Sequence, residues 1–204
     1  MPLAVDTYAV GPTQTNCYVV RADEATSDAV VIDPGYEIGR PDFSVSAILV
    51  THCHWDHLGG IAALAEVTGA PVYMAAHEAP VLEDPQSFYP GQPIRPYSAA
   101  VRLTGDETLE VAGISFDVVE VPGHSPGHIA FAIEGAIFSG DVLFAGSVGR
   151  TDLPFSDWDT LVESIRALFD RFPPDTIIYP GHGPPTTLGV EQAQNPFLAE
   201  LRAS

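Results

Sequence analysis

The sequence predicts an α/β fold, with two β-sheets packed face to face between outer helices in an αββα sandwich. Short apolar runs typical of buried strands occur in both halves of the chain. Segments with helical periodicity lie between and after these runs, which favours sheets covered by helices. The chain has 204 residues, 46% of them hydrophobic, and no linker-like stretch. We therefore expect a single globular domain over residues 1–204.

The first half should supply one sheet and its covering helix. A helix is expected over 61–68, because apolar residues recur there at helical spacing and Gly69 follows. A second, short helix is expected near 77–82. The segment 84–98 is rich in proline and aromatic residues and should be an irregular loop. Strands are expected at 18–20, 29–32, 45–50 and 72–74.

The second half repeats this arrangement and should supply the other sheet. A helix is expected over 157–169, with Ser156 as its N-cap and with Leu161, Ile165 and Leu168 on one apolar face. Strands are expected at 108–111, 114–121, 129–133, 136–139 and 176–179. Grouped strands with intervening helices in both halves are what the sandwich requires.

The charge of the chain argues against some partners. Eight basic residues, all of them arginine, oppose 27 acidic ones, for a net charge of −19. Such a surface repels phosphate backbones and anionic lipid headgroups, so we expect neither a nucleic-acid nor a membrane partner. The N-terminal segment does not read as a signal peptide, and two cysteines make no disulfide framework. A cytoplasmic protein with reduced cysteines is expected; the oligomeric state is left open.

The strongest chemical signal follows the expected strand at 45–50. Four side chains that bind transition metals, His52, His54, Asp56 and His57, lie within six positions. They fall between a strand and the helix over 61–68, where a tight loop can turn them inward together. Imidazole and carboxylate are ligands that Zn²⁺ and Fe²⁺ accept. The segment therefore predicts a metal site.

Three further candidate ligands follow later strands: His124, Asp141 and His182. Each comes after a glycine at which the backbone can turn sharply. Seven ligands are too many for one tetrahedral ion but suit two, provided that Asp141 bridges them. We expect two divalent ions, zinc with iron or manganese as alternatives, in a hydrolytic centre.

This pattern of histidines and aspartates is similar to that of the metallo-β-lactamase superfamily. Within it, the chain resembles short bacterial members of the glyoxalase II (hydroxyacylglutathione hydrolase) subgroup, which lack the C-terminal helical domain of full-length glyoxalase II. The narrower resemblance is carried by residues 144–152 (FAGSVGRTD) and by Asn195-Pro196-Phe197. It implies two mixed sheets in the sandwich. It also implies His52, His54 and His124 on one metal and Asp56, His57 and His182 on the other, with Asp141 between them.

The resemblance also implies a reaction. A hydroxide held between the two ions would attack the acyl carbon of a thioester of the hydroxyacyl-glutathione type, with catalytic roles for Asp56 and Asp141. True β-lactamases generally lack an aspartate at the position of Asp141 and a histidine at that of His57, so antibiotic hydrolysis is disfavoured. Full-length glyoxalase II tends to have a tyrosine soon after the last histidine, where this chain reads Gly183-Pro184-Pro185-Thr186, so the carrier thiol stays open.

Other reaction classes fit the same residues. Persulfide dioxygenases resemble the chain too and use a single iron, which His52, His124 and Asp141 would hold here. Hydrolysis of a lactone or a phosphodiester on the dinuclear centre is a further alternative. A metal-binding module without catalysis is a third class, which a complete and open metal site disfavours.

Three residues outside the ligand set are also candidates. Arg150 follows Asp141 in a loop expected to border the metals, so its guanidinium can hold a carboxylate on the thiol half of the substrate. The alternative is a surface arginine paired with Asp152 or Asp157. Asp33 precedes a Pro-Gly turn, where an aspartate is an ordinary turn residue, but the family resemblance implies that it can orient a ligand imidazole. His128 is expected to form hydrogen bonds behind the ligands.

Overall fold

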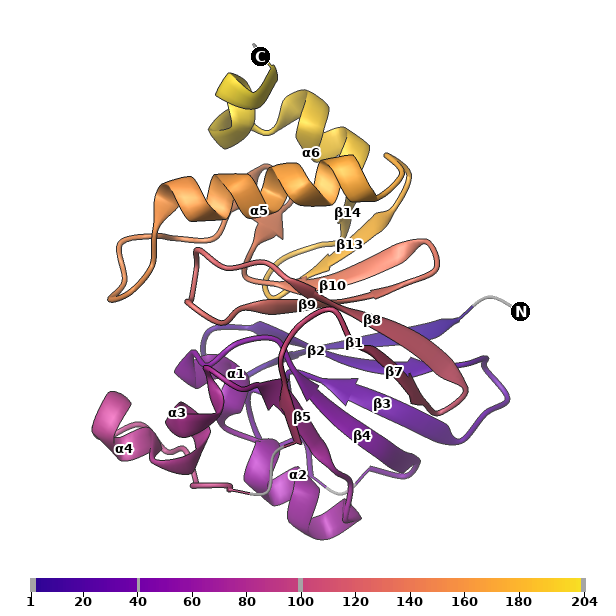
Figure 1. The fold of residues 1–204 in the computed structure, drawn as a ribbon. Helices are drawn as coiled ribbons and strands as arrows, with labels where there is room; N and C mark the ends of the chain where they lie inside the picture. Colours follow the sequence, from indigo (N-terminus) through magenta and orange to yellow (C-terminus); the bar gives the residue numbers. More distant parts are fainter. Residues whose placement is uncertain (1–2, 40, 99–100, 203–204) are drawn as a thin grey trace.

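The computed structural model describes residues 3–39, 41–98 and 101–202, and it confirms the αββα sandwich (Figure 1). The first six-stranded sheet has the order β1-β2-β3-β4-β5-β6 and the second the order β14-β13-β10-β9-β8-β7. Both sheets contain parallel and antiparallel pairs, so both are mixed, as the resemblance implies. No helix among the described residues is long and apolar enough to cross a membrane.

The first sheet and its helices come from the first half of the chain. Its strands are β1 (Ala4–Val10), β2 (Thr15–Arg21), β3 (Asp28–Ile32), β4 (Ser44–Val50), β5 (Val72–Ala75) and β6 (Val101–Leu103). Its helices are α1 (Trp55–Leu58), α2 (Ile61–Thr68), α3 (Ala79–Glu83) and α4 (Pro85–Phe88). The predicted helix over 61–68 is confirmed, and Gly69 ends it in a left-handed conformation with φ of 72°.

The second sheet and its helices come from the second half. Its strands are β7 (Thr108–Val111), β8 (Ile114–Glu120), β9 (Ile129–Ile133), β10 (Ala136–Gly140), β13 (Ile177–Pro180) and β14 (Thr186–Thr187), and β11 (Leu143–Phe144) pairs with β12 (Ser147–Val148) nearby. Helices α5 (Trp158–Arg171) and α6 (Leu188–Gln194) cover this sheet, and a 3₁₀ segment, η1, spans Pro196–Arg202 (Figure 1).

Three apolar layers hold these elements together. The central layer lies between the two sheets and includes three fully buried phenylalanines, Phe116, Phe131 and Phe138. Burial of each such ring stabilises the fold by roughly 1.5–3 kcal/mol. One outer layer packs α2 against the first sheet, and the other packs α5 against the second. Strands buried on both faces explain why β9 and β10 read as unbroken apolar runs.

Two predictions about helix ends are wrong. The N-cap of α5 is Asp157 and not Ser156, because the Asp157 carboxylate accepts the Thr160 N–H at 2.8 Å. Ser156 instead closes the preceding turn by bonding to the backbone of Leu153. Helix α3 begins two residues later than expected, at Ala79, which leaves His77 in an exposed turn. Within the expected loop 84–98, Pro85–Phe88 form the short helix α4.

The strand ends determine where the polar side chains gather. Strand β4 leads into His52, β8 into His124, β10 into Asp141 and β13 into His182. Because β10 and β13 are parallel neighbours, their carboxyl ends lie at the same edge of the second sheet. The sandwich thereby brings strand ends from both sheets to one edge.

Candidate metal centre

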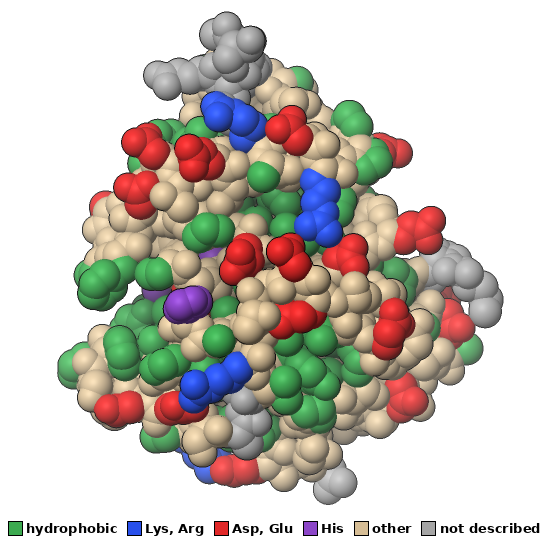
Figure 2. Space-filling model, viewed as in Figure 1, with side chains coloured by type: hydrophobic (Ala, Val, Ile, Leu, Met, Phe, Trp, Pro, Cys, Tyr) green, Lys and Arg blue, Asp and Glu red, His purple; other side chains and the backbone are tan. Residues whose placement is uncertain are grey.

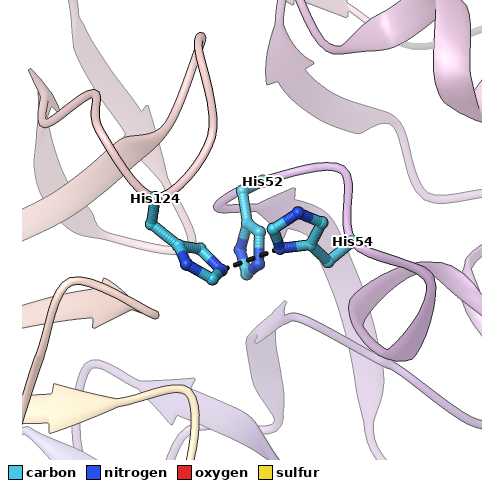
Figure 3. A group of neighbouring side chains, drawn as sticks. All are labelled: His52, His54 and His124. Atoms are coloured by element: carbon cyan, nitrogen blue, oxygen red, sulfur yellow. Dashed lines mark hydrogen bonds between the residues drawn. The ribbon is translucent and has the colours of Figure 1, made fainter. Parts of the chain in front are cut away.

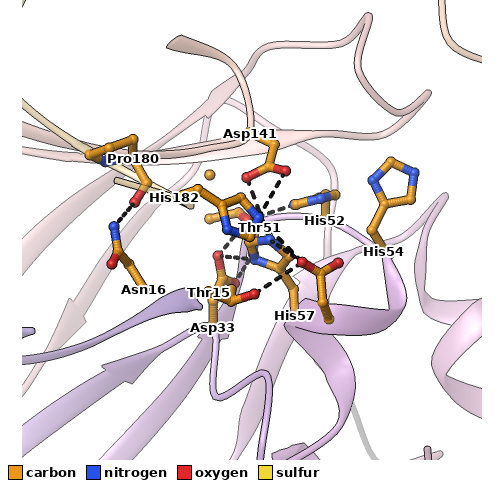
Figure 4. A network of polar contacts seen from close by, with 12 residues as sticks. Thr15, Asn16, Asp33, Thr51, His52, His54, His57, Asp141, Pro180 and His182 are labelled. Atoms are coloured by element: carbon orange, nitrogen blue, oxygen red, sulfur yellow. Dashed lines mark hydrogen bonds and ion pairs between the residues drawn. The ribbon is translucent and has the colours of Figure 1, made fainter. Parts of the chain in front are cut away.

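The structure brings all seven candidate ligands together at this edge. Two groups among them have nitrogen or oxygen atoms within 4.8 Å of one another. We call His52, His54 and His124 the first ligand group (Figure 3) and Asp56, His57 and His182 the second (Figure 4). The division is the same as the one that the family resemblance implies, although ligation itself stays a prediction.

In the first ligand group, hydrogen bonds fix which ring nitrogen is free. His124 Nδ1 donates to the backbone oxygen of Arg150 at 2.8 Å, which leaves a lone pair on Nε2. His52 Nδ1 lies 3.0 Å from Thr51 Oγ1, and its Nε2 is buried without a hydrogen-bond partner. His54 Nδ1 lies 2.7 Å from His124 Nε2. The three rings thus present nitrogen atoms to one point.

The second ligand group combines a carboxylate with two imidazoles. Asp56 Oδ2 lies 3.2 Å from His182 Nε2 and 3.9 Å from His57 Nε2. His57 Nδ1 donates to Asp33 Oδ2 at 3.0 Å, so in the neutral ring the lone pair is on Nε2, which is buried and unpartnered. This group therefore also offers two nitrogen atoms and one oxygen atom to a common point.

Asp141 lies between the two groups. Its Oδ2 is 3.6 Å from His124 Nε2 in the first group and 3.5 Å from His182 Nε2 in the second. Its Oδ1 is 3.5 Å from His57 Nε2. A Cβ at Gly181 would lie 2.0 Å from Asp141 Oδ1, so only glycine leaves room for this carboxylate. One carboxylate thus contacts imidazoles of both groups.

Asp33 lies behind the second group and orients it. Its carboxylate accepts the Thr51 N–H at 2.8 Å and the Thr51 hydroxyl at 2.7 Å, in addition to the His57 ring. Since the Thr51 hydroxyl donates to Asp33, its oxygen is available to accept from His52 Nδ1. Asp33 therefore fixes the tautomer of His57 directly and that of His52 through Thr51. The indirect contact with His52 was not predicted. Asp33, His52 and His57 form a third group of possible metal-binding atoms that lie close together. Because three hydrogen bonds already occupy the Asp33 carboxylate, we interpret Asp33 as a residue that orients the imidazoles and not as a metal ligand.

His128 lies behind the first group. It is fully buried, donates from Nε2 to the backbone oxygen of Ser139 at 3.1 Å, and stacks on the His52 ring with centroids 4.5 Å apart. A Cβ at Gly140, where φ is 53°, would lie 2.6 Å from His128 Nε2, so the glycine allows this packing. The contacts of His128 are thus with the protein behind the site.

Strand β2 holds the loop that carries His182, a role that sequence reasoning did not assign. Thr15 Oγ1 donates to Asp56 Oδ2 at 3.0 Å. The Asn16 amide donates to the backbone oxygens of Pro180, at 3.0 Å, and Gly183, at 2.8 Å (Figure 4). These contacts join the first sheet to the last ligand loop of the second.

Glu78 is a second residue that the sequence did not reveal. It is 2% exposed and accepts two backbone N–H groups, from Cys53 at 2.5 Å and from Gly127 at 2.8 Å. Cys53 lies between His52 and His54, and Gly127 lies in the turn that follows His124. One buried carboxylate therefore ties together two ligand loops from opposite sheets.

The two ligand groups differ in charge. Burial lowers the pKa of the His54 imidazole to about 4 and that of His52 well below its usual range, so the first group is neutral. Burial would raise the pKa of Asp56, but the hydrogen bond from His182 and the charge of His57 outweigh it and lower the pKa to about 2. Burial likewise opposes protonation of His182, yet hydrogen bonds to Asp141 and Asp56 raise its pKa to about 9.

These features fit a pair of cations. Buried polar atoms are nearly always paired, yet seven buried side-chain atoms of the described residues have no hydrogen-bond partner. Three of the seven, His52 Nε2, His57 Nε2 and Asp141 Oδ1, belong to the candidate ligand set. Imidazole and carboxylate donors suit zinc and iron alike, so the donor set alone does not select one metal.

Five of the seven candidate ligands line a cleft of about 910 Å³: His54, Asp56, His124, Asp141 and His182. Figure 2 shows hydrophobic side chains gathered over α3, α4 and the loop before α5. Arg150 lines the cleft, and its guanidinium pairs with Asp152 through contacts of 2.6 and 2.7 Å. This ion pair is the alternative given above for Arg150, a surface arginine paired with Asp152. The Arg150 side chain is nevertheless exposed and lines the cleft.

The chain is similar in sequence and in structure to known metallo-beta-lactamase superfamily proteins. The sequence profile of the metallo-beta-lactamase superfamily matches residues 10–182. The hydroxyacylglutathione hydrolase GloC of Haemophilus influenzae is 36% identical, over 91% of this chain and 93% of its own. A solved structure titled TTHA1623 in a di-iron-bound form is 40% identical with a TM-score of 0.81, covering 95% of this chain and 100% of that one. BLEG-1, titled a B3 metallo-beta-lactamase, is 38% identical with a TM-score of 0.85, covering 96% of this chain and 100% of its own.

Proposed function

The chain belongs to the metallo-beta-lactamase superfamily, and from this premise we propose that it is a dinuclear metallo-hydrolase that cleaves a thioester of the hydroxyacyl-glutathione type. The observation that carries the proposal is the position of Asp141, whose carboxylate contacts His124 of the first ligand group and His57 and His182 of the second. The 36% identity to the hydroxyacylglutathione hydrolase GloC supports the substrate class. The two free cysteines are consistent with a cytoplasmic enzyme that acts on a small molecule.

In the proposed enzyme the two ligand groups would each hold one metal ion. The first ligand group would hold one divalent ion and the second another, with Asp141 shared; zinc is proposed, with iron and manganese as alternatives. Two such ions supply an activated water and polarise the substrate carbonyl. In the overall reaction the water oxygen bonds to the acyl carbon, the C–S bond breaks, and the products are a carboxylic acid and a thiol.

The chain's own groups would handle orientation and protons. Asp56 Oδ2 is bonded by Thr15 and His182 and lies at the cleft, so it is placed to accept a proton from a water bound there. Asp33 accepts from Nδ1 of His57, and the Arg150 carbonyl accepts from Nδ1 of His124. Both rings are thereby oriented with Nε2 free to bind a metal. The Arg150 guanidinium is proposed to leave Asp152 and bind a carboxylate on the thiol half of the substrate.

A substrate screen on metal-loaded protein tests the proposal. We expect release of free thiol from S-lactoylglutathione, with close to two metal ions per chain by elemental analysis. Oxygen uptake with glutathione persulfide and one iron per chain would instead establish the dioxygenase alternative. Turnover confined to a lactone, a phosphodiester or the β-lactam nitrocefin would likewise reject thioester hydrolysis. Full activity with a single ion would reject the dinuclear centre.

A further inference from the structure

Two separate segments contribute apolar side chains to the lining of the metal cleft. Phe88 and Tyr89 come from α4 and the residue that follows it, and Leu153, Pro154 and Phe155 come from the loop before α5. We call these five residues the apolar rim. Phe88 is 51% exposed and Phe155 is 85% exposed. The fold itself therefore buries little of either ring, and both are available to a ligand.

Phe155 is presented to solvent by a well-connected turn. Its φ of 66° lies in the left-handed region, which residues with a side chain rarely adopt. Ser156 closes the turn by accepting the Leu153 N–H at 3.0 Å and donating to the Leu153 carbonyl at 2.6 Å. The Asp157 N–H then bonds to the Gly123 carbonyl at 2.8 Å, next to the ligand His124. An unfavourable backbone conformation thus places an exposed aromatic ring at the cleft, and burial within the protein does not compensate for it.

The cleft offers little to an anionic ligand beyond its metal ligands. Among the residues that line it, all within the described part of the chain, Arg150 is the only arginine, and the chain has no lysine. Arg150 is already paired with Asp152, and the chain carries a net charge of −19. Repulsion from this surface disfavours substrates with several negative charges. Apolar contact is therefore the main binding energy that the mouth of the cleft can provide.

We propose that the hydroxyacyl half of the substrate carries an apolar side chain, aliphatic or aromatic, that contacts Phe88 and Phe155. The inference rests on the proposed thioester hydrolysis, in which Arg150 serves the thiol half and the apolar rim is left for the acyl half. Fully burying one methylene group favours binding about fourfold. Hexanoyl adds four methylene groups to acetyl, so kcat/KM should rise at least tenfold between these two acyl groups even if they are only partly buried.

The test is a series of acetyl, butanoyl, hexanoyl and phenylacetyl thioesters of the uncharged thiol N-acetylcysteamine. For the wild-type protein, kcat/KM should increase along the aliphatic series. In Phe155→Ser and Phe88→Ser, the ratio of hexanoyl to acetyl kcat/KM should fall by at least fivefold. Phe197→Ser is the matched control, because Phe197 is 53% exposed but does not line the cleft. It should keep the wild-type ratio.

A binding measurement tests the contact between the apolar rim and the acyl chain independently of catalysis. Non-hydrolysable S-(2-oxoalkyl) thioethers of the same thiol should bind more tightly as the alkyl chain lengthens, and less so in Phe155→Ser. Turnover that is independent of acyl length, or a ratio unaffected by both rim substitutions, would overturn the inference and leave thioester hydrolysis standing. Absence of cleavage for every thioester would overturn the proposed function and the inference together.

Discussion

The floor and the mouth of the cleft are built in different ways. The floor, made of the seven candidate ligands, stands on strand ends of both sheets, and buried hydrogen bonds from Asp33, Glu78 and β2 fix it. The apolar rim stands on the short helix α4 and on a loop, and its two phenylalanine rings are exposed. The floor is therefore specified by the whole fold, whereas the rim can change without disturbing it. We expect the chemistry to depend on the floor and the choice of substrate on the rim.

The floor itself contains an asymmetry. The first ligand group is neutral because burial lowers its histidine pKa values. The second group and Asp141 contain ionised carboxylates balanced by imidazoles with raised pKa values, His57 and His182. A cation in the second group would displace protons from these rings, whereas a cation in the first group meets neutral rings. Substitutions in the two regions should therefore affect metal content to different degrees.

The largest effect is expected from Asp141→Asn. The substitution keeps the shape but removes the negative charge that lies between the two ligand groups. We expect both metal content and activity to fall, with kcat/KM reduced by about a thousandfold or more, the scale of losing a transition-state-stabilising group. Elemental analysis and thiol release on the same preparation measure both. Asp170→Asn, at an exposed position of α5, is the matched control. Wild-type metal content in Asp141→Asn would contradict its shared position.

Asp33→Asn should have a smaller but clear effect. Asparagine keeps one acceptor oxygen but places an amide where Thr51 and His57 donate, so the His57 ring loses its fixed tautomer. Loss of such a partner typically costs 10- to 100-fold in metal affinity or activity. Competition with a chromophoric chelator gives the metal affinity independently of turnover. An unchanged affinity together with a lowered melting temperature would show that Asp33 only stabilises the fold.

Glu78→Gln tests the link between the two sheets at the floor. Glutamine can accept only one of the two N–H groups that Glu78 now accepts, from Cys53 and Gly127. The loops carrying His54 and His124 should then lose their fixed spacing, and we expect about a tenfold lower metal affinity. Glu83→Gln, at the C-terminal end of α3 and paired with Arg102 on the surface, is the control. If Glu78→Gln changed only the melting temperature, Glu78 would have no positioning role.

The same contrast explains what the sequence could predict. Buried strands and the helix over 61–68 have strong periodicity, and the four metal-binding residues after β4 lie so close together that their pattern is recognisable. The αββα sandwich and the family were predicted correctly for this reason. The edge strand β1 was missed because none of its residues is fully buried and it lacks a clear apolar alternation. The prediction of Ser156 as the N-cap of α5 was wrong because the next residue, Asp157, is of a type that caps helices equally well.

The positioning residues were harder to predict. Glu78 acts through Cys53 and Gly127, which lie 25 and 49 residues away along the chain, and no local pattern marks such a contact. Thr15 likewise reaches Asp56 over 41 residues. The apolar rim was missed because the irregular segment 84–98 and the turn at Phe155 have no periodicity to interpret. Sequence reasoning thus predicted the candidate ligands and a role for Asp33, but not the contacts of Thr15 and Glu78 or the apolar rim.

The smallest effect is expected at the charged part of the mouth, from Arg150→Ala. The guanidinium is exposed and shared with Asp152, so a substrate carboxylate gains only the modest energy of a solvent-exposed ion pair. We expect KM for a carboxylate-bearing thioester to rise about threefold to tenfold while kcat stays nearly constant, the pattern of binding energy lost equally from substrate and transition state. The backbone oxygen that His124 uses is retained in this variant, so metal content should not change. A neutral thioester of similar size should show no effect, and high salt should reduce the effect on the charged one. Equal changes for both substrates would reject the carboxylate contact and leave Arg150 as the partner of Asp152.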